Sequence, residues 1–253
     1  MTSSSRPARR RGRRALTVLV AVVVVLALLA VGFLVWAHVV MPGDRTAALK
    51  VWRDDRVSVQ DAGDSVILRP TGPSNGVGVV FLPGAKVDPY AYLATFDGVA
   101  ASGTTVVITK PTLNLAFFDT RSLATFEEHA PDVTTWAVGG HSLGGVRACQ
   151  LATTPGTAGL LLLGSYCAND LSSSSLDVLS LSGSRDGLST PAKVGAARHL
   201  LPDSASSVVI RGADHAQFGH YGEQPGDNPA TVSHAHTDRV ITAQVSRWAA
   251  SLG

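Results

Sequence analysis

Several features that would narrow the function of this 253-residue chain are absent or scarce. It has two cysteines, and neither lies in the first 148 residues, which excludes a lipid anchor on an N-terminal cysteine. No metal-ligand spacing occurs: in the nearest approach, His234-Ala235-His236, the two histidines would lie on different faces of a helix. After residue 44 no cluster of Lys or Arg provides the basic face that nucleic-acid binding needs. We therefore expect no metal, no other cofactor and no nucleic-acid partner.

Charged residues are also missing from one continuous stretch, residues 15–40. This 26-residue run, ALTVLVAVVVVLALLAVGFLVWAHVV, contains no Asp, Glu, Lys or Arg. About 20 apolar residues suffice to cross a bilayer as a helix. The preceding residues 1–14 carry six arginines and no acid, an asymmetry that keeps the N-terminus in the cytoplasm. The pattern predicts a basic cytoplasmic head (1–14), a single-pass signal anchor (15–40) and an extracytoplasmic remainder.

The alternative is a cleaved signal peptide, which would leave a secreted protein. Such peptides have an apolar region of about 7–15 residues followed by a small-x-small cleavage site. The run here is longer, and its best cleavage candidate, Val35-Trp36-Ala37, contains a bulky Trp that suits a membrane interface. An uncleaved anchor is therefore favoured. Without the six arginines, 15 Lys and Arg face 19 Asp and Glu, so the outer part carries about −4.

The outer part is predicted to consist of a short linker (41–50) and one domain (51–253), which is long enough to bury a core and to be a catalytic domain. Residues 51–70 alternate apolar and polar around Ala62-Gly63-Asp64, which predicts a hairpin. Strand-like and helix-like segments then alternate. We expect strands at 76–84, 104–109, 135–139, 159–163, 177–181 and 207–211, and helices at 89–102, 122–129, 143–152, 191–201 and 232–252. This order predicts an α/β fold with a doubly wound, mostly parallel sheet.

The two cysteines, Cys149 and Cys167, allow two interpretations. In an oxidising compartment they could form a disulfide. Alternatively, each could be a buried single thiol of an α/β domain. The sequence leaves both open.

The pattern Gly-x-Ser-x-Gly, which surrounds the nucleophile of many serine hydrolases, occurs twice. Ser74, in GPSNG, lies between two expected strands in a Pro- and Asn-Gly-containing turn, with no helix after it. Ser142, in GHSLG, lies between the strand TWAVG and the helix LGGVRACQLA. A nucleophile elbow requires this strand–turn–helix setting, with glycines where the two backbones meet. Ser142 is therefore the predicted nucleophile.

A serine nucleophile needs a base that is oriented by a carboxylate. In this topology the partners follow in the order Ser, acid, His, each after a strand. Asp186 follows the strand DVLSL, and His215 follows SVVIR. The rival acid, Asp214, adjoins His215 on the same loop, and the rival base, His220, lies far past the strand. We predict the catalytic residues Ser142, Asp186 and His215.

Two backbone N–H groups should form an oxyanion hole for the tetrahedral intermediate. One is expected from Leu143, the residue after the nucleophile, and the other from the loop after the first parallel strand, Leu82–Lys86. Gly84 in this loop permits close approach to substrate. The N–H of Ala85 is favoured over that of Lys86.

From about Gly76 to the end, the chain resembles an α/β-hydrolase of the small bacterial group related to dienelactone hydrolases. The matching stretches are FLPGAKVDPYAY, KPTLNLAFFD, WAVGGHSLGG, LSGSRDGLSTPAKV and GADHAQFGHYGEQPGDNPAT. The resemblance implies the same triad, Ser142, Asp186 and His215, with Ala85 and Leu143 at the oxyanion positions. A dienelactone hydrolase normally has Cys as its nucleophile, so the Ser here favours a general ester hydrolase.

Many members of the superfamily insert a cap domain before the acid-bearing strand. Here 13 residues, GSYCANDLSSSSL, separate the strands GLLLL and DVLSL, which is too short for a cap and predicts an open site. The sequence thus indicates a membrane-anchored serine hydrolase acting on a small-molecule or lipid-like ester. Thioester or amide hydrolysis, acyl transfer and a catalytically idle binding module are the alternatives. A dehalogenase would need a carboxylate at position 142.

Overall fold

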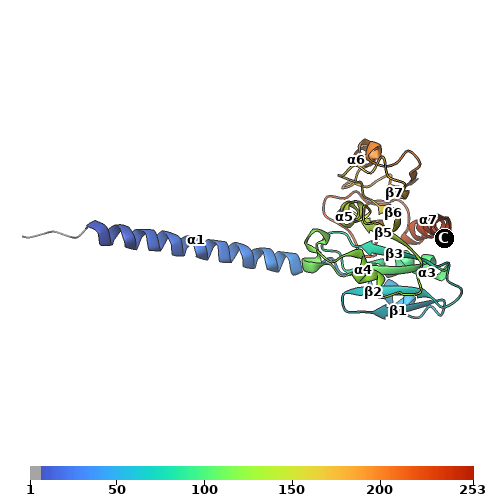
Figure 1. Ribbon diagram of the computed structural model, residues 1–253, viewed down its shortest axis with the longest axis horizontal. Helices are drawn as coiled ribbons and strands as arrows, with labels where there is room; N and C mark the ends of the chain where they lie inside the picture. The colour runs from blue at the N-terminus through green and yellow to red at the C-terminus, as the bar shows by residue number, and fades with distance from the viewer. Residues whose placement is uncertain (1–6) are drawn as a thin grey trace, which may run out of the picture. The chain divides into compact units, whose positions relative to one another are not determined.

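The computed structural model describes residues 7–253, which divide into two compact units at Val39/Val40 (Figure 1). The first unit consists of helix α1 (Pro7–His38). Its most apolar 18-residue window has a mean hydropathy of 3.4, and the segment Gly12–His38 is long and apolar enough to cross a membrane, a test that a signal sequence also passes. The helix begins inside the arginine-rich head, whose residues 1–6 lie outside the described residues.

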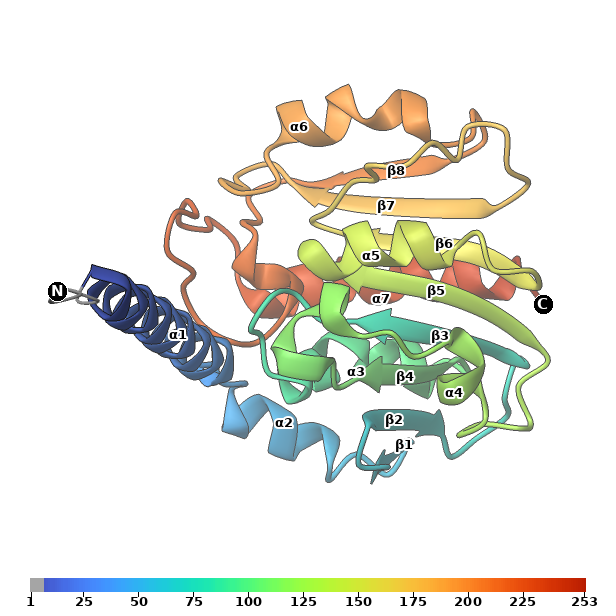
Figure 2. The ribbon, with the colours of Figure 1, turned by 60° about the vertical axis from the view of Figure 1, so that its left-hand side comes forward.

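The second unit is built on one sheet (Figure 2). Among residues 7–253, eight strands pair in the order β1-β2-β4-β3-β5-β6-β7-β8. The pairs β1–β2 and β2–β4 are antiparallel and the remaining pairs are parallel. The strands are β1 (Val57–Asp61), β2 (Ser65–Pro70), β3 (Val77–Leu82), β4 (Thr105–Thr109), β5 (Thr135–His141), β6 (Thr157–Leu163), β7 (Asp177–Gly183) and β8 (Ser206–Ile210). The expected hairpin and the mostly parallel sheet are confirmed.

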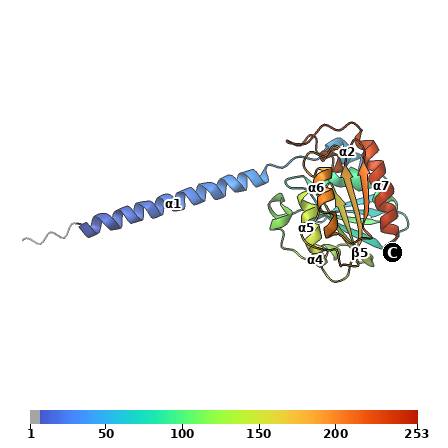
Figure 3. The same cartoon turned by 90° about the horizontal axis from the view of Figure 1, so that it is seen from above.

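Helices cover both faces of this sheet (Figure 3). Helices α2, α3 and α7 contribute to the core on one face, and α4 and α5 to the core on the other, where the segment after α6 also packs. The helices are α2 (Arg45–Val51), α3 (Leu93–Ala101), α4 (Leu123–Glu127), α5 (Leu143–Leu151), α6 (Pro191–Ala196) and α7 (His234–Ala250). Short 3₁₀ turns are η1 (Pro89–Tyr92), η2 (Thr112–Asn114), η3 (Ala116–Phe118), η4 (Arg198–Leu200) and η5 (Ala216–Phe218).

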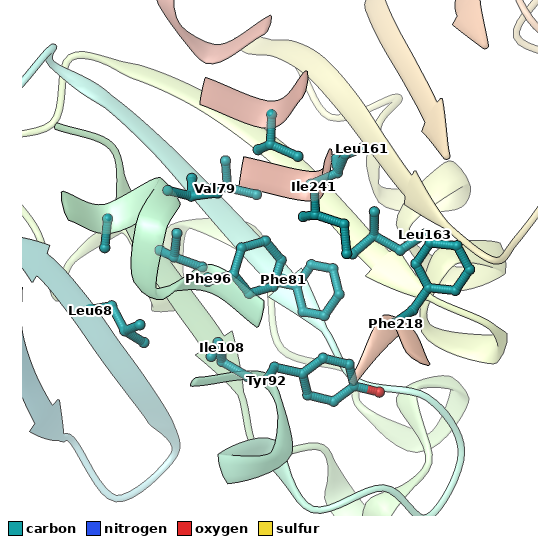
Figure 4. Close-up of a cluster of buried hydrophobic side chains, with 14 of the residues drawn as sticks. Leu68, Val79, Phe81, Tyr92, Phe96, Ile108, Leu161, Leu163, Phe218 and Ile241 are labelled. Atoms are coloured by element: carbon teal, nitrogen blue, oxygen red, sulfur yellow. The ribbon is translucent and has the colours of Figure 1, made fainter. Parts of the chain in front are cut away.

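Strand β3 shows why its continuous apolar run fits this position. All six of its residues are buried, and successive side chains of a strand point to opposite faces. Val79 and Phe81 pack into the core with Phe96 and Ile241, as Figure 4 shows. Val80 lies in the opposite core. A strand covered on both faces has no use for polar alternation.

Two segments differ from the expectation. The stretch 41–50, expected as a linker, contains most of helix α2, which begins at Arg45. Its N-cap is Asp44, whose carboxylate accepts from the N–H groups of Thr46 and Ala47. Its last residue, Val51, is buried in the core. A seven-residue helix is too short to show a periodicity in the sequence. The helix expected at 191–201 is divided into α6 and η4.

Cys149 and Cys167 form a disulfide with a Cα–Cα distance of 5.5 Å, which resolves the alternative that the sequence left open. The bond joins helix α5 to the loop between β6 and β7, across a separation of 18 residues. Closing a loop of this length in the unfolded chain corresponds to about 3 kcal/mol of stabilisation.

Candidate active site

Ser142 occupies a sharp turn between β5 and α5, as the sequence predicts. Its φ of 51° and ψ of −124° lie in a region that non-glycine residues rarely adopt. A Cβ added to Gly140 would lie 2.4 Å from the backbone carbon of Gly144, and one added to Gly144 would lie 2.2 Å from the carbonyl oxygen of Leu82. Both positions therefore require glycine. The result is a partly exposed serine at the N-terminus of a helix, at the carboxyl edge of the sheet.

The loop after β7 and the loop after β8 bring Asp186 and His215 together. Nδ1 of His215 lies 2.8 Å from Oδ2 of Asp186, and the two residues are 0% and 2% exposed. The other carboxylate oxygen of Asp186 accepts from the N–H groups of Leu188 (2.8 Å) and Ser189 (2.7 Å). An acceptor-only carboxylate assigns the proton to Nδ1 of His215 and leaves Nε2 with its lone pair.

Nε2 of His215 is buried and has no hydrogen-bond partner. His215 is thus hydrogen-bonded to Asp186. Among the described residues, no hydrogen bond joins Ser142 to His215. The ring of His141, the residue before Ser142, lies 4.5 Å from that of His215 between centroids, so His215 adjoins the elbow. Catalytic hydrogen bonds are often long before substrate binds.

In the loop after β3, the N–H groups of Ala85 and Lys86, the two alternative oxyanion donors, differ in their hydrogen bonding. The N–H of Lys86 donates to the carbonyl oxygen of Asn114 at 2.8 Å and is therefore occupied. No backbone hydrogen bond occupies the N–H of Ala85 or of Leu143 within residues 7–253. The contact of Gly144 with the carbonyls of Leu82 and Pro83 holds this loop directly against the first turn of α5.

The rival residues have other roles. The hydroxyl of Ser74 accepts from the N–H of Gly76 in an exposed turn. The carboxylate of Asp214 accepts from the N–H groups of Gln217 and Ala230, and so fixes its own loop. Nε2 of His220 lies 3.1 Å from the Asp238 carboxylate.

A second histidine, His141, is part of the site, although the sequence motif gave it no role. It is fully buried, and its Nδ1 lies 2.9 Å from the hydroxyl of Tyr92, which accepts from the N–H of Gly84. Burial, with His215 as the next cause, holds the pKa of His141 well below its usual value. His141 is therefore neutral and, through Tyr92, connects the loop Leu82–Lys86 to the side of His215.

Asp227 is the other residue that sequence reasoning missed. One of its carboxylate oxygens accepts from the N–H groups of His215 (2.8 Å) and Ala216 (3.0 Å). The other accepts from Gly187 and Asn228, both at 2.8 Å. A single carboxylate thus holds the loop of His215 and the loop of Asp186 at the same time. No local signal marks this role, because Asp227 lies in a Gly-, Pro- and Asn-rich loop where Asp is a common turn residue.

No group of three or more His, Cys, Asp or Glu side chains is arranged to hold a metal ion in the described part of the chain. Between β6 and β7 the connection contains no helix or strand, so no cap is inserted there.

Comparison with known proteins identifies the fold and the family. No curated protein matches the sequence. The esterase domain of a Rhodothermus marinus protein is similar in structure, with a TM-score of 0.58 and 13% identity over 78% of this chain and 100% of that chain. An α/β serine hydrolase without lid from Xanthomonas campestris gives 0.54 and 14% over 78% and 96%. The dienelactone hydrolase of Anabaena variabilis gives 0.52 and 16% over 76% and 97%.

At these identities the likeness concerns the fold, and it confirms the expected α/β-hydrolase architecture. A model of the alpha/beta hydrolase family matches residues 78–239, well over half of the sequence. The chain belongs to the alpha/beta hydrolase family.

Proposed function

We propose that the protein is a membrane-anchored serine hydrolase that cleaves carboxylic esters with Ser142 as nucleophile, His215 as base and Asp186 as the orienting acid. The observation that carries this proposal is the buried hydrogen bond between His215 and Asp186, which leaves Nε2 of His215 as an unpartnered acceptor. A buried carboxylate fixes the tautomer of the imidazole and stabilises the imidazolium that forms during catalysis.

In the first half-reaction, Nε2 of His215 takes the proton of the Ser142 hydroxyl while the oxygen attacks the ester carbonyl. The intermediate collapses when His215 returns this proton to the departing alcohol, which leaves an acyl-serine. Water then attacks the acyl carbonyl, again with His215 as base, and Ser142 and the free carboxylic acid are regenerated. Each turnover consumes one water, and no cofactor takes part.

The negative oxygen of the two tetrahedral intermediates would be stabilised by the N–H groups of Ala85 and Leu143. The engagement of the Lys86 N–H with Asn114 favours Ala85 as the donor from this loop. Leu143 is the first residue of α5, where a helix has unpaired N–H groups and a positive dipole end. Each such donor is worth roughly 3–4 kcal/mol of transition-state stabilisation.

The membrane part of the proposal rests on α1. Its apolar length fits a bilayer, and six arginines precede the apolar run. A disulfide between Cys149 and Cys167 is supporting evidence for an oxidising, extracytoplasmic compartment.

A fluorophosphonate probe, which reacts with activated serines, tests the catalytic assignment on the full-length protein in detergent. The parent should be labelled, and Ser142→Ala should abolish labelling and reduce ester hydrolysis by roughly 10⁴–10⁶-fold. Ser74→Ala is the matched control, because it removes the serine of the second Gly-x-Ser-x-Gly pattern. Labelling that persists in Ser142→Ala, or a parent that is not labelled, would overturn the proposal.

Substrate type is tested with p-nitrophenyl esters of increasing acyl length beside matched thioesters and anilides. Hydrolysis of the esters with a higher kcat/KM than either analogue is expected. A preference for a thioester, an anilide or an acyl acceptor other than water would replace the ester assignment.

Membrane anchoring is tested by carbonate extraction of the C-terminally tagged protein and by its mass, which differs if the N-terminal segment is removed.

A further inference from the structure

The second unit begins at Val40, and its next residue, Met41, is hydrogen-bonded at the end of the loop Leu82–Lys86. We call Leu82–Lys86 the oxyanion loop, because it carries the proposed donor Ala85. The N–H of Met41 donates to the carbonyl oxygen of Lys86 at 2.7 Å, and the N–H of Asp88 donates to that of Met41 at 3.0 Å. These two bonds form a parallel bridge between Met41 and Val87. Lys86 follows Ala85, the proposed oxyanion donor. Met41, the second residue of the unit, is therefore held against the loop that is proposed to serve the reacting carbonyl.

The covalent connection to the apolar helix is short. Helix α1 ends at His38, three residues before Met41. Three extended residues span at most about 10 Å, whatever path they take. If α1 crosses the membrane as proposed, the loop of Lys86 cannot move farther from the end of the helix than this connection allows.

Two aromatic side chains are exposed beside the same loop. Phe117 and Phe118, in η3, are 44% and 50% exposed. Their segment is tied to the oxyanion loop by the bond from the Lys86 N–H to the Asn114 carbonyl oxygen. We call Phe117 and Phe118 the aromatic tip.

The aromatic tip is also fixed to the helix that carries the nucleophile. Ala116, the first residue of η3, is buried in the same core as Ala148 of α5. The guanidinium of Arg147, also in α5, donates to the carbonyl oxygen of Asp119 at 3.4 Å. A movement of the tip would therefore disturb α5 and the oxyanion loop together. The two rings of the tip remain 44% and 50% exposed, and exposed aromatic rings are favoured at a membrane–water interface.

We propose that the aromatic tip contacts the membrane in which α1 is anchored, and that the site hydrolyses amphiphilic esters that reside in that membrane. This rests on the proposed ester hydrolysis and anchoring. The short connection keeps the mouth of the site close to the lipid surface, and the tip gives that mouth an apolar edge. A lipid-borne ester then reaches Ser142 from the bilayer, without first dissolving in water. The products are a fatty acid and an alcohol-bearing headgroup, from one water per bond cleaved.

The test uses the full-length protein reconstituted in vesicles of phosphatidylcholine and phosphatidylglycerol. One assay follows a fluorogenic diacylglycerol ester placed in the same vesicles, and the other follows p-nitrophenyl acetate in the surrounding water. The double variant Phe117→Ser/Phe118→Ser should lower the ratio of the vesicle-ester rate to the soluble-ester rate about tenfold, because it removes apolar area from the lipid contact. The matched control Val209→Ser removes an exposed apolar side chain, 59% exposed, from the edge strand β8 and should leave the ratio unchanged.

A second variant carries a long Gly-Ser insertion between Val39 and Val40, which preserves the bonds of Met41 but frees the catalytic unit from its short connection. It should also lower the ratio. An unchanged ratio in both variants would overturn the inference, as would equal losses on the two substrates, which would indicate a structural role for the tip. If the tip variant alters dimerisation in light scattering and leaves the ratio intact, the tip is an interface between copies.

The two proposals fail in different ways. A parent that cleaves neither ester contradicts the proposed function itself. A parent that cleaves p-nitrophenyl acetate but not the vesicle ester supports ester hydrolysis and contradicts only the membrane-borne substrate.

Discussion

Asp227 offers the sharpest test of how the site is held together. Its carboxylate accepts four backbone N–H groups at 2.8–3.0 Å, from His215 and Ala216 on one oxygen and from Gly187 and Asn228 on the other. In Asp227→Asn, one oxygen becomes an amide NH₂, which cannot accept. Whichever way the amide turns, two N–H groups lose their acceptor and face another donor.

The magnitude follows from the bonds that are lost. Hydrogen bonds to a charged group contribute about 1.5–3 kcal/mol each, and the partial exposure of Asp227 places the effect in the lower part of this range. We expect Asp227→Asn to lower the free energy of unfolding by about 2–4 kcal/mol. In one orientation of the new amide the backbone N–H of His215 loses its acceptor, and in the other that of Gly187 does. Either loss would shift a loop of the proposed triad, so kcat should fall about 10–100-fold with little change in KM.

The assay is urea unfolding followed by tryptophan fluorescence in detergent, together with kcat and KM on a soluble p-nitrophenyl ester. Asp170→Asn is the matched control, since the Asp170 carboxylate accepts a single N–H, that of Ser172, in a surface turn. It should change stability by less than about 0.5 kcal/mol. If Asp227→Asn matches the parent in both unfolding midpoint and kcat, the bridging carboxylate does not position the catalytic loops.

Two further predictions concern stability. Replacing Cys149 and Cys167 by serine should lower the free energy of unfolding by about 3 kcal/mol, measured by urea unfolding; a parent whose stability is insensitive to dithiothreitol would contradict this. Because burial depresses the pKa of His141, the folded state binds fewer protons than the unfolded chain below about pH 6.5. The free energy of unfolding should therefore fall as pH is lowered below this value, by up to about 1.4 kcal/mol per pH unit. His141→Phe should flatten this dependence in unfolding curves recorded across the range, and an unchanged slope would assign it to other groups.

Most of the strands and helices could be predicted from local patterns of apolar, polar and turn residues in the sequence. Each expected strand corresponds to a strand of the sheet, and the run in β3 is buried on both faces because helices cover both sides. The elbow was also predictable, since a strand that turns sharply into a helix around a serine requires glycine where the two backbones meet. In this chain those positions are Gly140 and Gly144. Such features depend on neighbours in the chain, so the sequence contains the information needed to find them.

The features that the sequence could not supply depend on contacts between distant residues. The positions of His215 and Asp186 after their own strands were predictable, but their common support by Asp227 requires knowing how the 219–230 loop returns to them. The hydroxyl of Tyr92 reaches His141 across 49 positions. The choice between a disulfide and two thiols likewise depended on where the β6–β7 loop lies against α5.

The segment after α1 is bonded to two of the loops that form the candidate site. Met41 exchanges backbone hydrogen bonds with Lys86 and Asp88, at the end of the oxyanion loop. The N–H of Asp44 donates at 2.6 Å to the carbonyl oxygen of His220, on the loop that continues from the proposed base. Removal of Met41 would therefore leave two backbone partners of the oxyanion loop without their bonds, at a cost that neighbouring solvent only partly offsets. It follows that a soluble form of the second unit should begin at Val40. A chain that begins at residue 44 would keep the proposed triad but lose the support of the loop that carries Ala85.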